Sequence, residues 1–205
     1  MFEKIKKYGL RKSILILLKK LLGFEILKFH YLIFDGDITE LSKKLDSALN
    51  VKILEYEDFC KGDKTVFNAN KLKLIKQRLE SGEYIAYGIL ENNRLLYSTW
   101  ISLNYISFPL VADRFKLEKN EAILEDSYCS VDARGRGFHS KMNIFRVVRL
   151  YELGKNKIVA IVLDGNTPAF KVQYKTGFKN IGKPFYVFSL FGIKYTTFKK
   201  ENYDC

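Results

Sequence analysis

The sequence predicts an α/β (α+β) fold in which helices flank a mixed, strongly twisted sheet of about six to eight strands. Residues 84–106 contain two runs of β-branched and aromatic residues joined by an Asn-Asn pair, which is typical of an antiparallel hairpin. Residues 122–163 contain a strand pattern, a glycine-rich loop, an amphipathic helix and a continuous apolar run, which indicates a parallel strand pair with a crossover helix. The chain has 205 residues, only three prolines and no low-complexity tract, so we expect one folded domain over residues 25–205 after a separate segment over residues 1–24.

Residues 1–24 are predicted to form a basic amphipathic helix. Residues 1–30 carry eight Lys and Arg residues against two Glu residues, a local charge of +6 that is half of the formal net charge of +12. The apolar run at 14–18 is far shorter than the ~20 residues that cross a bilayer, and Lys19 and Lys20 interrupt any signal-peptide core. The apolar side of this helix either packs on the domain or lies on an anionic membrane surface as a peripheral contact.

The first half of the domain is expected to alternate short strands and helices. A strand over residues 29–34 precedes a helix that Asp37 caps, with Glu40 at the capping-box offset, and that extends to about Leu49. Residues 51–56 predict another strand. A second helix stops near residues 81–82, just before the hairpin, and its apolar stripe consists of Leu72, Ile75 and Leu79.

The second half predicts the order strand, loop, helix, strand, helix and two strands. The expected elements are a strand at 122–131, a helix that ends at Gly154, a strand at 157–163, a helix at about 167–175 closed by Gly177, and two strands within 185–198 hinged near Gly192. The long helix has its apolar face at Ile144, Val147, Val148 and Tyr151. No linker or internal repeat divides this order, which agrees with a single domain.

The loop Arg134-Gly135-Arg136-Gly137 predicts an anion site. It follows a strand and opens a helix, where the first turn offers unpaired amide N–H groups and the positive end of the helix dipole. Glycines let a phosphate approach the backbone, and arginines add charge-assisted donors. The loop lacks the Gly-Lys-Ser/Thr ending of a P-loop, and Ser140 stands where a dinucleotide fingerprint has its third glycine.

Residues 129–138 resemble the acetyl-CoA-binding segment of the GNAT acetyltransferase superfamily, whose pattern is Arg or Gln, two residues, Gly, any residue, then Gly or Ala. Residues 166–178, which read Asn-Thr-Pro-Ala and then Lys-Thr-Gly-Phe, resemble the later motif of the same family. The resemblance covers about residues 121–180 and the order of elements around them. It implies a GNAT-like fold and transfer of an acetyl group from acetyl-CoA to an amine.

By this resemblance, the loop and strand residues would hold the diphosphate and pantetheine of acetyl-CoA. His139 departs from the pattern, because it stands where Gly or Ala is usual. With only two histidines in the chain, we expect no metal site. The expected cofactor-binding residues are Tyr128, Cys129, Ser130, Val131, Arg134, Gly135, Arg136, Gly137, Phe138, His139, Ser140, Asn166, Ala169 and Lys175.

Three residues are candidates for proton transfer. Glu125 and Asp126 lie near the beginning of the strand before the loop, and strand alternation would let only one of them face the site as general base. The family's general-acid tyrosine would fall on Gln173, and Tyr174 is one residue late, so it either serves as the acid or packs on the sheet. Trp100 either forms a wall of the acceptor site or lies in the core.

The predicted function is an acyl-CoA-dependent N-acetyltransferase acting on a primary amine of a small molecule. Its hairpin and loop are similar to those of members that modify amino sugars in cell-envelope polysaccharide synthesis, so an amino sugar or nucleotide-linked amino sugar is the expected acceptor. Two alternatives remain: an idle CoA- or partner-binding GNAT-like domain, and a nucleic-acid-binding module, for which the net charge gives only non-specific affinity. Three widely spaced cysteines suggest a reducing, cytoplasmic location, with membrane contact through the N-terminal helix.

Overall fold

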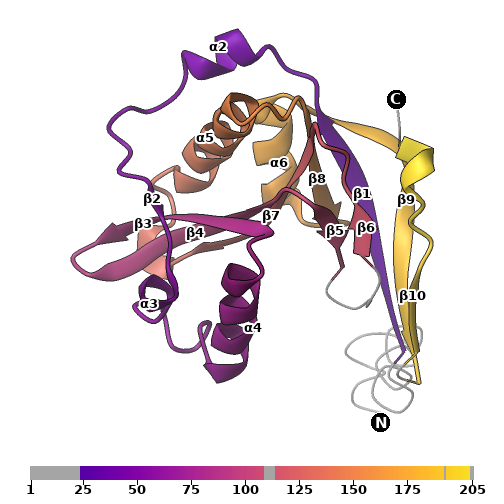
Figure 1. Cartoon of the computed structure of the whole chain (residues 1–205), viewed down its shortest axis with the longest axis horizontal. Coiled ribbons are helices and arrows are strands. Elements are labelled where there is room, and N and C mark those ends of the chain that lie inside the picture. Colours follow the sequence, from indigo (N-terminus) through magenta and orange to yellow (C-terminus); the bar gives the residue numbers. More distant parts are fainter. Residues whose placement is uncertain (1–23, 109–113, 192, 204–205) are drawn as a thin grey trace, which may run out of the picture.

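A computed structural model describes residues 24–108, 114–191 and 193–203 of the chain. Its main feature is an eight-stranded sheet in the order β10-β9-β1-β8-β7-β4-β3-β2, in which only β7 and β8 are parallel (Figure 1). The strands are β1 (Glu25–Phe34), β2 (Lys52–Ile53), β3 (Tyr84–Glu91), β4 (Arg94–Ser102), β7 (Glu121–Cys129), β8 (Lys157–Leu163), β9 (Phe178–Leu190) and β10 (Ile193–Thr196), and a separate small hairpin holds β5 (Tyr105–Ser107) and β6 (Arg114–Lys116). The predicted mixed sheet flanked by helices is confirmed.

Helices cover both faces of this sheet. In Figure 1, α5 and α6 lie on one face, and α3 and α4 lie on the other, beneath the half of the sheet that contains β3 and β4. The helices are α2 (Ile38–Ser42), α3 (Tyr56–Phe59), α4 (Ala69–Glu80), α5 (Phe138–Glu152) and α6 (Thr167–Thr176), with 3₁₀ turns η1 (Val131–Ala133) and η2 (Lys200–Tyr203). Within the described residues, no helix has both the length and the apolar character that a bilayer crossing requires. The predicted helix over 1–24 lies outside the described residues except for its last position.

Three buried clusters form the core. The largest lies between the sheet and the helices α5 and α6, and it includes Tyr97, Met142 and Leu150. A second lies beneath the β5–β6 hairpin, where aromatic rings of β1, β9 and the C-terminal segment pack against one another, both stacked and edge-to-face. The third fills the space between the sheet and the helices α3 and α4, where the Trp100 ring stacks on Phe59 at 5.3 Å.

The predicted helix to Leu49 is wrong, because α2 ends at Ser42. Asp37 does cap it by accepting from the amide of Thr39, but the Ser42 hydroxyl donates back to the carbonyl of Ile38, and Leu45 is largely exposed. The helix therefore ends at Ser42, and Leu49 packs against the main cluster from a segment outside the helix.

The predicted strand over 51–56 is wrong in its second half. The amide of Glu55 donates to the carboxylate of Asp58 at 3.0 Å, which starts α3 instead of continuing the strand. At the other end of the chain, β9 begins at Phe178, earlier than the expected 185, because Phe178 pairs with Phe34 of the long strand β1.

Candidate active site

The parallel strands β7 and β8 separate partway along their length. Their pairing runs from Glu121 opposite Lys157 to Leu124 opposite Ala160 and stops there, although both strands continue. Beyond this point β7 still pairs with β4, and β8 still pairs with β1, so only the facing edges have opened. The result is a wedge in the middle of the sheet with main-chain amides along both sides.

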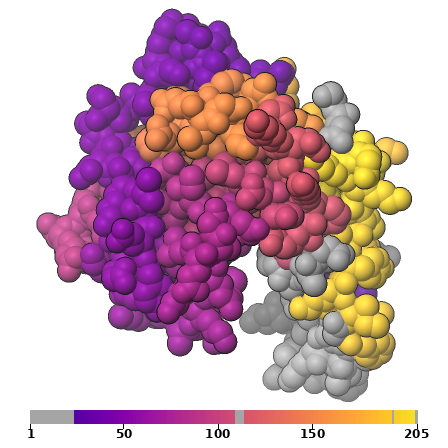
Figure 2. Space-filling view, in the orientation of Figure 1, coloured from indigo at the N-terminus to yellow at the C-terminus, as the bar shows by residue number. Residues whose placement is uncertain are grey.

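A cleft of about 910 Å³ occupies this wedge and extends toward α4 and the β5–β6 hairpin. The space-filling view shows a gap at the lower edge of the molecule, between the purple region that contains α4 and the yellow C-terminal region (Figure 2). Its polar lining residues include Lys71, Arg78, Glu83, Arg114, Glu125, Asp126, Ser127, His139, Arg146, Asn166 and Gln173. Of the predicted site residues, the cleft brings together Glu125, Asp126, His139, Asn166 and Ala169.

A β-bulge places both acidic residues of β7 at the cleft. Thr99 of β4 pairs with Ser127, and the next residue, Trp100, pairs with Glu125, so Asp126 is the extra residue. The expected alternation of Glu125 and Asp126 across the sheet is therefore wrong, because the bulge interrupts it. Both residues line the same cleft.

Glu125 has the environment of a proton acceptor. Its side chain is only 9% exposed, and its Oε1 atom has no hydrogen-bond partner among the described residues. Burial raises the pKa of Glu125 to about 7; the charge of Arg78 opposes this rise and that of Asp126 adds to it. Asp126, in contrast, is 43% exposed and lies 2.6 Å from the ammonium group of Lys71.

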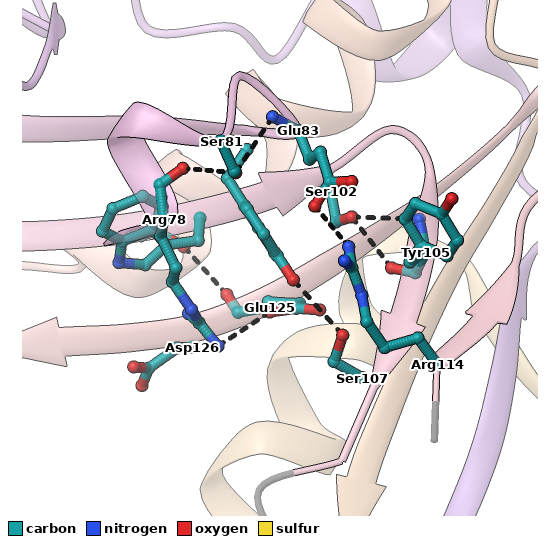
Figure 3. Close-up of polar contacts among 12 residues, drawn as sticks. Arg78, Ser81, Glu83, Ser102, Tyr105, Ser107, Arg114, Glu125 and Asp126 are labelled. Carbon is teal, nitrogen blue, oxygen red and sulfur yellow. Dashed lines mark hydrogen bonds and ion pairs between the residues drawn. The ribbon is translucent and has the colours of Figure 1, made fainter. Parts of the chain in front are cut away.

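Arg78 reaches Glu125 from α4. Its Nη2 atom lies 3.3 Å from Oε2 of Glu125, and its guanidinium lies over the rings of Tyr84 and Trp100 (Figure 3). The two ring contacts fix the guanidinium in place, so that it orients the carboxylate of Glu125 while Oε1 stays free.

Arg146 of α5 holds the bulge from the other face of the sheet. This fully buried guanidinium donates through Nη1 to the carbonyl oxygens of Trp100 and Glu125, at 3.2 and 3.1 Å, and through Nη2 to Asn143 at 2.8 Å. The Asn143 amide in turn donates to Gln173 and to Thr176 of α6. Complete burial lowers the pKa of Arg146 to about 10, which keeps the group charged at neutral pH. The bulged backbone at Glu125 is thus tied to both helices.

The glycine loop meets the cleft at the start of α5. Gly137 caps the helix with φ +76°, and the first helical bond runs from the amide of Lys141 to the carbonyl of Gly137. No described residue accepts from the amides of Phe138, His139 and Ser140, as expected for a first turn. A Cβ atom added at Gly137 would meet nothing closer than 3.9 Å, so the space beside this turn is open, and a helix start with unpaired amides is the kind of place where an anion binds.

The two arginines of the glycine loop differ in whether they already form an ion pair. Arg136 forms a bidentate ion pair with Glu91 at 2.6 and 2.9 Å, and its guanidinium lies over the ring of Phe138. Arg134 is exposed at the end of η1, next to the glycines. Arg134 is therefore the better placed of the two for an added anion, since Arg136 would have to leave a carboxylate.

His139 lines the cleft as a neutral ring. Burial, with a smaller contribution from the charge of Arg146, lowers the pKa of His139 to about 4. At neutral pH this imidazole carries no charge, so it can accept or donate one hydrogen bond but does not attract an anion.

Several predicted residues lie outside the cleft. Tyr174 is 51% exposed and stacks on Phe170, so its hydroxyl does not face the wedge, whereas Gln173 lines the cleft and is buried. Trp100 is 2% exposed, and its ring belongs to the core beneath α3 and α4, so the predicted acceptor wall is wrong. Lys175 is exposed at the end of α6.

The side chains of β7 beyond the bulge pack into the fold. Tyr128 contacts the Phe67 ring edge-to-face at 4.8 Å, and Cys129 packs against the cluster beneath α5. Their expected role toward acetyl-CoA can therefore involve the main chain, while the Val131 side chain, 70% exposed, stands free beside the loop. The described residues contain no group of three His, Cys, Asp or Glu side chains suited to a metal ion.

The sequence did not predict that Arg78, Arg146 and Gln173 belong to one network of polar contacts with Glu125. A signal for the two arginines exists: Arg78 follows Ile75 by three positions, and Arg146 follows Met142 by four, so each charge falls on an apolar helix face. A charge on such a face must be paired or hydrogen-bonded, which marks it as a candidate site residue.

Comparisons with known proteins relate this geometry to one fold family. No protein-family model and no curated protein matches the chain. Among solved structures, a protein from Novosphingobium aromaticivorans described as a GNAT-family acetyltransferase superimposes with a TM-score of 0.56 at 14% identity, covering 79% of this chain and 63% of its own. The aminoglycoside 6'-N-acetyltransferase AAC(6')-Ig from Acinetobacter haemolyticus gives 0.51 at 12% identity (65% and 93%), and AAC(6')-Iy in complex with a CoA-containing bisubstrate analogue gives 0.50 at 15% identity (65% and 92%).

These likenesses show that the chain has the fold of GNAT acetyltransferases. The chain spans less than two thirds of the length of the Novosphingobium aromaticivorans protein.

Proposed function

We propose that this chain is an acetyl-CoA-dependent N-acetyltransferase that acts on a primary amine of a small molecule. The observation that carries the proposal is the wedge between β7 and β8. It places the buried carboxyl group of Glu125, whose Oε1 atom has no hydrogen-bond partner among the described residues, in the same cleft as His139 of the first turn of α5. The shared fold supports the proposal, because the AAC(6')-Iy structure holds a CoA-containing analogue on that fold.

The residues present fit a CoA thioester. The amides of Phe138, His139 and Ser140 would bind the diphosphate, together with Arg134, and the open edges of β7 and β8 would pair with the amides of the pantetheine arm. Asn166, which caps α6 by accepting from the amide of Ala169, lines the same cleft. When bound, acetyl-CoA supplies an activated acyl group, which passes to nitrogen as the C–S bond breaks and one net proton is released.

Glu125 performs the proton step in this proposal. An amine that enters the cleft is protonated at neutral pH, and it must lose a proton before its nitrogen can form a bond. The carboxylate of Glu125 accepts that proton, directly or through a water molecule, since a pKa of about 7 lets it take a proton from an ammonium and pass it to water. Arg78 keeps Oε2 oriented during the transfer.

The position of the expected general acid is occupied by Gln173, which cannot donate a proton to a leaving thiolate. This observation favours a second candidate, a catalytically idle domain that binds CoA or a partner. Turnover distinguishes the two candidates, because an idle domain binds acetyl-CoA without releasing its thiol.

Three narrower expectations remain predictions. An amino sugar or nucleotide-linked amino sugar as acceptor rests on the sequence resemblance, as does a role in cell-envelope polysaccharide synthesis. A cytoplasmic location rests on the cysteine pattern. Peripheral membrane contact rests on the charge of residues 1–24, and its test is loss of liposome pelleting when these residues are removed.

Calorimetry with acetyl-CoA tests the proposal through a matched pair of variants. Gly137 and Gly154 lie at opposite ends of α5, with φ +76° and +75° and no atom within about 3.9 Å of an added Cβ, so Gly137→Trp and Gly154→Trp carry the same backbone strain. We expect Gly137→Trp to abolish acetyl-CoA binding and Gly154→Trp to retain it. Thiol release from acetyl-CoA in the presence of amino sugars, polyamines and amino acids then reports turnover. Equal affinity in both variants would contradict the assigned site.

A further inference from the structure

Resting on the proposed function, we infer that the acceptor amine carries its own anionic group, a carboxylate or a phosphate, which Arg114 binds while the amine lies at Glu125. The neighbouring aminoglycoside acetyltransferase is named for a different kind of amine. The inferred acceptor class therefore differs from the aminoglycosides for which that protein of the same fold is named.

The acceptor half of the cleft is lined by ion pairs, each with one cation and one carboxylate. They are Lys71 with Asp126, Arg78 with Glu125, and Arg114 with Glu83. These charges cancel. Arg146 adds one positive charge that no described carboxylate balances, because its hydrogen bonds go to two carbonyl oxygens and to the side-chain oxygen of Asn143.

The cleft therefore carries an excess positive charge, and the excess grows when Glu125 accepts a proton. An acceptor with several ammonium groups would meet net repulsion in this site, within a chain whose formal net charge is +12. An acceptor with one amine and one anionic group would neutralise the excess instead. The charge balance thus selects against polyamines and in favour of an amine that carries an anion.

Arg114 is the cation whose N–H donors are best placed to bind a ligand. It projects from β6, its guanidinium lies 3.9 Å from the ring centre of Tyr105, and one Nη atom pairs with Glu83. With 40% of its side chain exposed, it lines the cleft and can offer its other N–H groups to a ligand. Arg78 is less able to do so, because only 21% of its side chain is exposed and two rings enclose it.

Glu125 and Arg114 lie within reach of one small molecule. Figure 3 shows Glu125 between Arg78 on one side and Arg114 on the other, around the same space. Among the charges that act on the Glu125 pKa, those of Arg78 and Arg114 both oppose the rise that burial causes, so both guanidiniums are electrostatically coupled to this carboxyl group. The neighbouring hydroxyls of Tyr84 and Ser107, 3.2 Å apart, border the space between them.

The test uses pairs of amines that differ in one anionic group: glycine against glycinamide, phosphoethanolamine against ethanolamine, and glucosamine 6-phosphate against glucosamine, with spermidine as the polycation. Binding to the CoA-saturated protein and acetylation are both measured. We expect the anionic member of at least one pair to bind about 10- to 100-fold more tightly, as a charge-assisted hydrogen bond provides. The carboxylate and phosphate pairs show which anion is recognised.

Arg114→Gln should remove this preference, so that the two members of each pair bind with about equal affinity. Arg149→Gln is the matched control, because Arg149 also has one carboxylate partner, Glu152, and a half-exposed side chain, but lies outside the cleft. Equal binding within every pair, tighter binding of spermidine, or a preference that survives Arg114→Gln would overturn the inference. Because amine binding is measured without turnover, these results stay distinct from a failure of acetyl transfer itself.

Discussion

Replacing Glu125 by glutamine should stabilise the protein and inactivate it at the same time. The variant resembles the protonated carboxyl group, so the difference between the two proteins is the cost of ionising Glu125 in the folded state. Its pKa rises from 4.5 to about 7, and at 1.36 kcal/mol per pKa unit the cost is about 3 kcal/mol. With only 9% of the side chain exposed, solvent screening reduces this value little.

The sign of the effect depends on pH. Because the folded pKa lies above the unfolded value, the folded state of the wild type retains a proton that the unfolded chain releases. Below pH 4.5 both states are protonated, and the two proteins should be equally stable. As the pH rises through 7, the wild type loses up to about 3 kcal/mol relative to Glu125→Gln.

Urea denaturation at pH 5 and pH 8 measures this difference, and Asp126→Asn is the control. Asp126 is the adjacent carboxylate of the same strand, but it is 43% exposed and paired with Lys71, so its replacement should give no stability gain at pH 8. In steady-state assays, Glu125→Gln should lose about 10²- to 10⁴-fold in kcat/KM, the usual contribution of a general base. A constant stability difference between pH 5 and pH 8 would refute the buried-carboxyl argument, and full activity would refute the proton role.

Three further substitutions test the roles assigned to Arg146, Tyr174 and Glu121. Arg146→Met should destabilise the fold by about 3 kcal/mol because it removes the charged donor from two carbonyl oxygens, and it should raise the His139 pKa, which NMR titration measures. Tyr174→Phe should change kcat by less than about twofold, because the hydroxyl faces solvent; a large loss in kinetic assays would restore Tyr174 as the acid. Glu121→Gln should cost about 3 kcal/mol in urea titrations at pH 7, because ion pairs and an amide hydrogen bond outweigh burial and lower the pKa of this carboxylate; the cost should shrink below pH 4.5 and vanish as the pH falls through the lowered pKa of the folded state.

The part of the fold that sequence predicts best is the segment from β7 to α6. Its elements are long, their apolar periods are clear, and Gly137, Gly154 and Gly177 mark helix ends with positive φ values that glycine adopts without strain. The short elements near residues 38–59 were harder to predict, since single side-chain bonds from Ser42 and Asp58 decide where they end.

The site was predictable where it depends on local order and not where it depends on distant contacts. The glycine loop and Glu125 follow from neighbouring residues in the chain. The bulge at Asp126 depends on pairing with β4, and the roles of Arg78 and Arg146 depend on helices from two other parts of the chain. Tyr174 shows the same limit, because one position along α6 decides between the cleft and solvent.

The central position of β1 has a consequence for biosynthesis. This strand is made before the rest of the sheet, yet among the described strands it pairs with β8 and β9, which are synthesised only after β2, β3, β4 and β7. Until then its residues Tyr31 and Leu32, fully buried in the finished protein, are exposed to water and to other nascent chains. Half of the sheet can assemble during synthesis, while the other half must wait, so chaperone dependence and aggregation of truncated chains should concentrate on this one strand.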